Sequence, residues 1–298
     1  MVYNIVVLSR LGDGYIMLAG QEITTLVFML YCSDPEGRLQ TERVSGGPQR
    51  LVFLHGLMGR GRNFTRIAKS LTETTTSLLV DLPNHGNSCW TEHFDYLQMA
   101  DLVAEELRND FCKDEPAVIL GHSMGGKVAM ILALRHPELL AGLIVEDISP
   151  THSSTSEFEH LLGTLLGIDL TNLTSRMDAH AAIKAEITDD AVRGFLLQNL
   201  VRDGQGGFRW EPNLQMLFEN LDVIVDFPEV HATFDKHPVL WIKGERSPYI
   251  DEAAGEIMRE LFPMTRKIQI RDAGHWLHAE QPQQFSESVS YYLAGRYS

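Results

Sequence analysis

Cysteine is scarce in this sequence, and the few cysteines follow no recognisable pattern. Cys32, Cys89 and Cys112 are odd in number, lie far apart and form no Cys-x-x-Cys pair. A disulfide-stapled fold or a zinc site would need a denser and more regular set. We therefore expect three reduced thiols in a cytoplasmic protein, and no metal site.

Basic residues and long apolar runs are also in short supply. Lys and Arg together number 25 against 40 Asp and Glu, which gives a formal net charge of −15. This charge repels phosphate backbones and anionic lipid surfaces, so nucleic acid is not an expected partner. The apolar run at 26–32 is shorter than the roughly 20 residues of a membrane span, and the chain does not start like a signal peptide. We expect a soluble protein with no membrane span.

From residue 51 onward, short apolar runs alternate with longer stretches of helical periodicity. The runs show almost no polar alternation, which is typical of strands buried on both faces. Strands that alternate with helices form a mostly parallel central sheet flanked by helices, an α/β fold. The predicted strands are 51–55, 77–81, 117–121, 143–147, 239–243 and 267–271. The predicted helices are 63–71, 95–109, 124–136, 252–261 and 284–293.

The alternation stops between residues 151 and 235, a stretch too long for a loop in a compact domain. We therefore predict a helical cap at 151–235, inserted into a core formed by 48–150 and 236–298. Residues 1–47 have an uncertain role, with a candidate antiparallel edge strand at 25–31 and a loop at 34–47. The predicted cap helices are 158–166, 179–187, 190–200 and 213–221.

The motif Gly-x-Ser-x-Gly occupies residues 121–125, between a predicted buried strand and a predicted helix. This is the setting of a nucleophile elbow, in which a sharp turn with positive φ exposes the serine hydroxyl. The flanking glycines relieve the crowding of that turn. The alternative is an ordinary glycine-rich helix start. We predict that Ser123 is a nucleophile.

A serine nucleophile needs a base and a site for the oxyanion. His275 follows the last predicted strand, in the order that α/β hydrolases use, and His278 is the competing base. The segment 55–59, His-Gly-Leu-Met-Gly, follows an earlier strand and could otherwise be a simple glycine turn. We predict that the backbone N–H groups of Leu57 and Met124 form an oxyanion hole.

Five segments together resemble the α/β-hydrolase domain-containing protein 11 group and its bacterial acyl-esterase relatives. They are LVFLHGLMG, NHGNS, GHSMGGKVAM, VEDISP and DAGHWLHAEQPQQF. The resemblance spans about residues 51–293 and leaves out the first fifty. It implies an α/β-hydrolase fold and hydrolysis of carboxylic esters, thioesters or acylglycerols through an acyl-enzyme on Ser123, without a metal or organic cofactor.

The acid of the triad departs from the commonest pattern of this superfamily. The usual Gly-x-x-Asp turn after the strand at 239–243 has Ser247 where the aspartate is expected. The resemblance offers a precedent for an acid after the preceding strand, which ends in Glu146 and Asp147. Strand alternation points these two side chains to opposite sides, so only one can face His275. We choose Asp147, with Ser247 as a possible fourth member, Glu245 as the runner-up, and a helix-capping role for Asp147 as the alternative.

Other functions are possible on the same fold. One is hydrolysis of a carbon–carbon bond or a lyase step, and another is a catalytically idle member that binds a partner. The retained Ser, His and oxyanion segments argue against the idle alternative. The substrate-pocket candidates are His55, His122, Phe158, Leu162 and Trp276.

Overall fold

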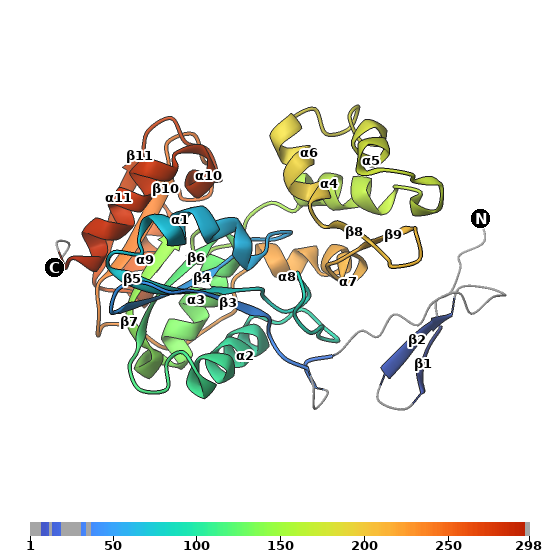
Figure 1. Cartoon of the computed structure of the whole chain (residues 1–298). Coiled ribbons are helices and arrows are strands. Elements are labelled where there is room, and N and C mark those ends of the chain that lie inside the picture. Colours follow the sequence, from blue (N-terminus) through green and yellow to red (C-terminus); the bar gives the residue numbers. More distant parts are fainter. Residues whose placement is uncertain (1–6, 12–13, 19–30, 34–36, 296–298) are drawn as a thin grey trace.

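A computed structural model describes residues 7–11, 14–18, 31–33 and 37–295 of the chain (Figure 1). Seven strands form one sheet in the order β11-β10-β7-β6-β4-β5-β3, and every neighbouring pair except β3–β5 is parallel. The predicted parallel α/β sheet is confirmed. Its strands are β3 (Thr41–Val44), β4 (Gln49–Leu54), β5 (Thr75–Val80), β6 (Ala117–His122), β7 (Leu140–Glu146), β10 (Val239–Gly244) and β11 (Thr265–Ile270).

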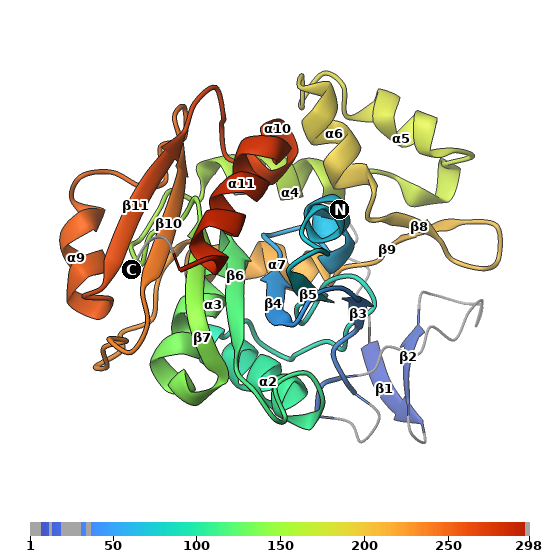
Figure 2. The same cartoon turned by 60° about the vertical axis from the view of Figure 1, so that its left-hand side comes forward.

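Helices cover both faces of this sheet (Figure 2). Alternate residues of β4 divide between the two layers: Val52 and Leu54 pack with α2 and α3, whereas Leu51 and Phe53 pack with α1 and α11. Two apolar faces explain why the strand sequences lack polar alternation. The core helices are α1 (Thr65–Ser70), which follows a short 3-10 turn (Gly61–Phe64), α2 (Tyr96–Asn109), α3 (Met124–Arg135), α9 (Ala254–Leu261), α10 (Leu277–Glu280) and α11 (Pro282–Leu293).

The antiparallel edge strand of the sheet is not where the sequence predicted it. Most of the candidate at 25–31 lies outside the described residues, and the edge strand is β3, in the segment predicted as a loop. Its sequence, Thr-Glu-Arg-Val, is short, polar and partly exposed. Such an edge strand carries almost no apolar signal. Nearer the N-terminus, β1 (Val7–Leu11) and β2 (Gly14–Leu18) form a separate hairpin.

Cys32 and Cys89 form a disulfide across 57 residues of sequence, so the prediction of three reduced thiols is wrong. Backbone pairing brings them together, because Cys32 N donates to Trp90 O at 2.7 Å and Tyr31 bridges to Trp90. Cys112 is the free, buried cysteine. The cytoplasmic location loses its support, since it rested on reduced thiols and disulfides are rare in reducing compartments. Within the described part of the chain, no helix has both the length and the apolar character to cross a membrane.

The segment 151–235 lies between β7 and β10, and we call it the cap. Its helices form a group to one side of the sheet (Figure 1), and it also contains a two-stranded hairpin that the sequence did not predict. Its division from the core at 151 and 235 stays a prediction. The cap elements are α4 (Ser156–Leu166), α5 (Arg176–Ala182), α6 (Asp190–Leu197), β8 (Leu200–Arg202), β9 (Phe208–Trp210), α7 (Leu214–Glu219) and α8 (Leu221–Val225).

Candidate active site

Ser123 occupies a strained turn between β6 and α3. Its φ is 51° and its ψ is −121°, a conformation that costs a non-glycine residue free energy and that its neighbours must enforce. A Cβ on Gly121 would lie 2.2 Å from Gly125 O, and one on Gly125 would lie 2.4 Å from Leu54 O. Both glycines of the motif are therefore sterically required, and the turn has the shape expected of a nucleophile elbow.

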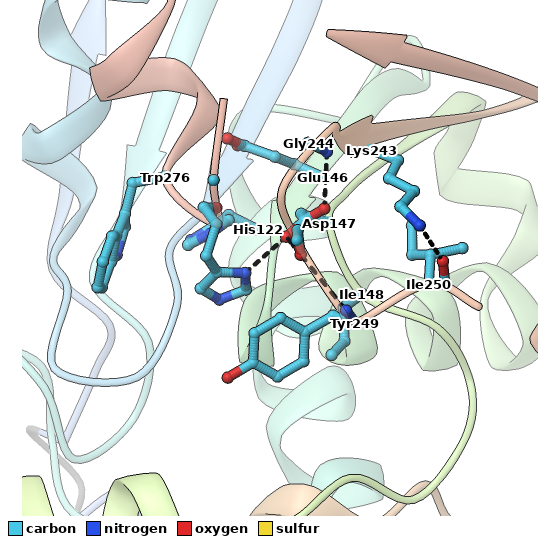
Figure 3. Close-up of polar contacts among 12 residues, drawn as sticks. His122, Glu146, Asp147, Ile148, Lys243, Gly244, Tyr249, Ile250 and Trp276 are labelled. Carbon is cyan, nitrogen blue, oxygen red and sulfur yellow. Dashed lines mark hydrogen bonds and ion pairs between the residues drawn. The ribbon is translucent and has the colours of Figure 1, made fainter. Parts of the chain in front are cut away.

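The structure brings Asp147 and His275 together across 128 residues of sequence. Asp147 follows β7 directly and is completely buried, and its Oδ2 lies 2.8 Å from His275 Nδ1. The same carboxylate accepts a 2.9 Å hydrogen bond from Gly244 N (Figure 3) and a short one from Ser247 Oγ. Since a carboxylate only accepts, His275 Nδ1 carries a proton, and its Nε2 is left as the basic nitrogen.

Three aromatic rings surround His275. The ring centroid of Tyr249 lies 4.3 Å from that of His275, and those of His122 and Trp276 lie at 4.7 and 5.8 Å. His122 directly precedes Ser123, and its Nε2 donates to His275 O at 2.9 Å. Burial and the neighbouring His275 lower the pKa of His122 well below 6.5, so this ring is neutral. The loop of His275 and the turn of Ser123 are thus joined side by side.

The predicted oxyanion loop packs directly on the nucleophile turn. A Cβ added to Gly56 would lie 2.8 Å from His122 Nδ1 and 3.2 Å from Ser123 Cβ, so glycine favours this close approach. Met124 is the first residue of α3, and its N–H has no acceptor within the helix. Among the described residues, no group accepts a hydrogen bond from Leu57 N. Both predicted donors are thus available to a ligand.

The alternative base and acid are engaged elsewhere. His278 Nδ1 and its backbone N–H both donate to Glu146 Oε1, at 2.8 and 3.0 Å. Glu245 accepts from Asp272 N at 2.9 Å. Glu146 and Asp147 thus engage different histidines of one loop. Asp147 lies beyond the end of β7 and has a φ of 53°, so strand alternation does not set the direction of its side chain. The sequence suggested no function for Glu146 or Tyr249. For Glu146, its position next to Asp147 was the signal that could have indicated a role at the site.

His122, Glu146 and His278 are close enough to be considered as metal ligands. One ligand atom from each lies within 4.8 Å of the others, and Glu146 Oε2 is buried with no hydrogen-bond partner among the described residues. Binding a cation through His278 Nδ1 would displace its proton and break its hydrogen bond to Glu146. We therefore interpret the three side chains as a hydrogen-bonded support for the His275 loop.

The five pocket candidates have different surroundings. His55 and His122 are buried and hydrogen-bonded to neighbouring backbone. Leu162 is buried and Phe158 half-buried in the apolar core. Trp276 lines a cavity of about 630 Å³ between α6 and the His275 loop, with Val192 and Phe195 on its apolar wall. Of the five candidates, Trp276 is the one that lines this cavity, and neither Ser123 nor His275 is among the lining residues.

Two buried histidines behind the oxyanion loop make stability depend on pH. Burial lowers the pKa of His55 from 6.5 to about 4 and that of His85 to about 3. Between pH 6.5 and 4 the unfolded chain binds protons that the folded chain does not, so the free energy of unfolding falls as pH decreases. Each histidine contributes a slope of up to about 1.4 kcal/mol per pH unit.

Urea unfolding at pH 7.5, 6, 5 and 4.5 measures this dependence. Below pH 6, the free energy of unfolding of His85→Gln should fall less steeply with decreasing pH than that of the unchanged protein. The difference in slope should correspond to about one proton. An exposed histidine provides the control, and His231→Gln should leave the slope unchanged. Equal slopes for all three proteins would contradict the prediction.

This fold and this site define a class of protein. The chain belongs to the α/β-hydrolase family, whose model, described as "alpha/beta hydrolase fold", matches residues 49–282.

Individual relatives are similar over most of the chain. Mouse (Mus musculus) "sn-1-specific diacylglycerol lipase ABHD11" is 34% identical over 251 residues, which are 82% of this chain and 80% of that protein. "Esterase YbfF" of Escherichia coli (strain K12) is 29% identical, and the match covers 86% of this chain and 97% of that protein. The solved structure "Marine microorganism esterase" superposes with a TM-score of 0.82 at 31% identity, covering 86% of this chain and all of that one.

Proposed function

We propose that this chain is a serine hydrolase that cleaves carboxylic esters through an acyl-enzyme on Ser123. The observation that carries the proposal is the hydrogen bond between His275 Nδ1 and the buried carboxylate of Asp147, next to an elbow that holds Ser123 at positive φ. A buried carboxylate fixes the histidine tautomer and offsets the charge of the imidazolium that forms during the reaction. A merely structural role for Asp147 would not require a histidine at this position.

The proposed reaction has two halves. His275 Nε2 takes the proton of Ser123 Oγ as this oxygen attacks the ester carbonyl, and the N–H groups of Leu57 and Met124 stabilise the resulting oxyanion. The imidazolium then protonates the departing alcohol. In the second half, His275 activates a water that hydrolyses the acyl-enzyme, and Ser123 is regenerated with release of a carboxylic acid.

The substrate class follows from the relatives and from the cavity beside Trp276. The printed names of the relatives describe a diacylglycerol lipase and esterases. The wall formed by Val192, Phe195 and Trp276 suits an acyl chain, and the net charge of −15 disfavours polyanionic substrates. We therefore propose neutral acyl esters, including acylglycerols, as substrates. Thioesters are an alternative substrate class to be tested.

A panel of p-nitrophenyl esters with acyl chains of two to sixteen carbons tests this function, together with acyl-thioesters and a diacylglycerol. We expect saturable hydrolysis whose kcat/KM varies at least tenfold with chain length, because an apolar wall gains about 0.8 kcal/mol per buried methylene. A phosphonate-treated sample is the control. Turnover of a carbon–carbon substrate without any ester hydrolysis would favour the alternative reaction on this fold. Failure of every substrate together with failure of phosphonate labelling would favour the idle, partner-binding alternative.

A further inference from the structure

We infer that the cap positions the oxyanion hole through two buried basic side chains, Arg60 and Lys127. This inference rests on the proposed function, in which Leu57 and Met124 supply the oxyanion donors. Arg60 comes three residues after Leu57, and Lys127 comes three residues after Met124. Each side chain is nearly inaccessible and is bound by groups of the cap. The cap therefore holds both halves of the oxyanion hole.

The first connection starts at Arg60, whose side chain lies under the cap hairpin. Its Nη1 is 2.7 Å from Glu211 Oε2, and both side chains are almost fully buried. Its Nη2 donates to Gln198 O at 2.8 Å and to Asn199 Oδ1 at 3.0 Å. All of these partners flank the cap hairpin, since Gln198 and Asn199 precede β8 and Glu211 follows β9. A buried ion pair with these additional hydrogen bonds fixes geometry, whatever its net contribution to stability.

Asn199 transmits this connection to the oxyanion loop. It is completely buried, and its Nδ2 donates to Met58 O at 2.7 Å. Met58 is one of the two central residues of a turn closed by a 2.9 Å hydrogen bond from Gly59 N to Gly56 O, and its φ is 60°. A residue in this region costs free energy and persists only where its surroundings hold it. Because Leu57 is the other central residue of the same turn, the cap amide also fixes the direction of Leu57 N–H.

The second connection runs through Lys127, one turn into the helix that Met124 begins. Its Nζ donates to Val225 O and Asp226 O, both at 2.7 Å, and to Ile224 O at 3.3 Å. These three carbonyls lie at the end of α8, where the chain leaves the last cap helix. This buried amino group with three carbonyl acceptors ties the helix of the nucleophile to the segment that leads from the cap back to β10.

Oxyanion donors act only if they are held in place before the charge develops. Asn199, Glu211 and the end of α8 are therefore positioning residues that act through Leu57 and Met124 without touching the substrate. Loosening them should weaken binding of the transition state more than binding of the ester itself. The expected signature is a loss of kcat with little change in KM.

Asn199→Ala and Arg60→Met test the first connection, and Lys127→Met tests the second, with Glu211→Gln as the mildest variant. Steady-state kinetics with a p-nitrophenyl ester are combined with the affinity for a trifluoromethyl ketone, which forms a tetrahedral oxyanion on the serine. We expect Asn199→Ala to lower kcat by about 10- to 100-fold with KM within about 3-fold, and to weaken the ketone by the same factor. Glu211→Gln should cause a smaller loss of the same kind, and it keeps the test valid if a larger change unfolds the protein.

Arg193 supplies a matched control. Its guanidinium is equally buried but binds Ile187 O and Asp190 within the cap. Arg193→Met should lower the unfolding temperature and leave kcat and the ketone affinity within about 3-fold. The inference would be overturned, with the proposed function left standing, by either of two results. One is a loss of kcat in Arg193→Met as large as that in Asn199→Ala, and the other is a folded Asn199→Ala variant with unchanged kcat. An unchanged protein that hydrolyses no ester would overturn the proposed function and the inference with it.

Discussion

Replacing Ser123 with alanine is expected to lower kcat/KM for ester hydrolysis by about 10³-fold or more. The reason is that the variant loses the atom that forms the acyl-enzyme, while the oxyanion donors and the cavity beside Trp276 stay intact. Residual activity over the uncatalysed reaction should therefore persist. The measurement is steady-state kinetics with a p-nitrophenyl ester, supported by mass spectrometry of the protein after treatment with a fluorophosphonate.

The fluorophosphonate should add one mass increment to the unchanged protein and none to Ser123→Ala. Ser70 is a suitable control, since its hydroxyl donates to Ile67 O within α1 and takes no part in the proposed chemistry. Ser70→Ala should keep both labelling and activity. An alanine variant at 123 that is still labelled, or still fully active, would refute the assignment of the nucleophile.

The second large effect concerns the carboxylate behind His275. Asp147→Asn is expected to lower kcat by about 10²- to 10⁴-fold with the fold intact. An amide cannot offset the charge of the imidazolium, and it can leave His275 with the proton on the wrong nitrogen. Circular dichroism and the unfolding temperature should stay close to those of the unchanged protein, because the amide keeps the shape of the side chain.

Two further variants separate Asp147 from its neighbours. Ser247→Ala removes one of the donors to the carboxylate and should reduce kcat by less than about 10-fold, since His275 and Gly244 N still hold Asp147. Glu245→Gln should have little effect, because Glu245 binds the backbone of Asp272. A large loss of kcat in Glu245→Gln together with a small loss in Asp147→Asn would show that Asp147 is not the acid of the triad.

The position of the acid can be understood from the sheet. β7 and β10 are parallel neighbours, and Glu146 is paired with Ile242 in their register. The ends of both strands therefore lie at the same edge, so a carboxylate after β7 can reach the histidine that an acid after β10 usually serves. Gly244 and Ser247, at the end of β10, contribute hydrogen-bond donors to the carboxylate.

The sequence by itself determined the local features of this protein. Six strands lie within three residues of their predicted bounds. Five of them are mostly buried, and strands covered on both faces need apolar runs, whereas β11 is a half-exposed edge strand. The Gly-x-Ser-x-Gly motif predicted the tight turn at Ser123, because glycine is required on both sides of it. In each case the signal comes from neighbouring residues.

Only the tertiary structure decided which distant residues meet. The disulfide of Cys32 with Cys89, the pairing of Asp147 with His275, and the contact of Arg60 with Glu211 join segments separated by 57 to about 150 residues. A short polar strand such as β3 is likewise recognisable only once β5 lies beside it. The physical reason is that backbone conformation follows local sterics and burial, whereas these contacts depend on how helices and strands pack after the chain has folded.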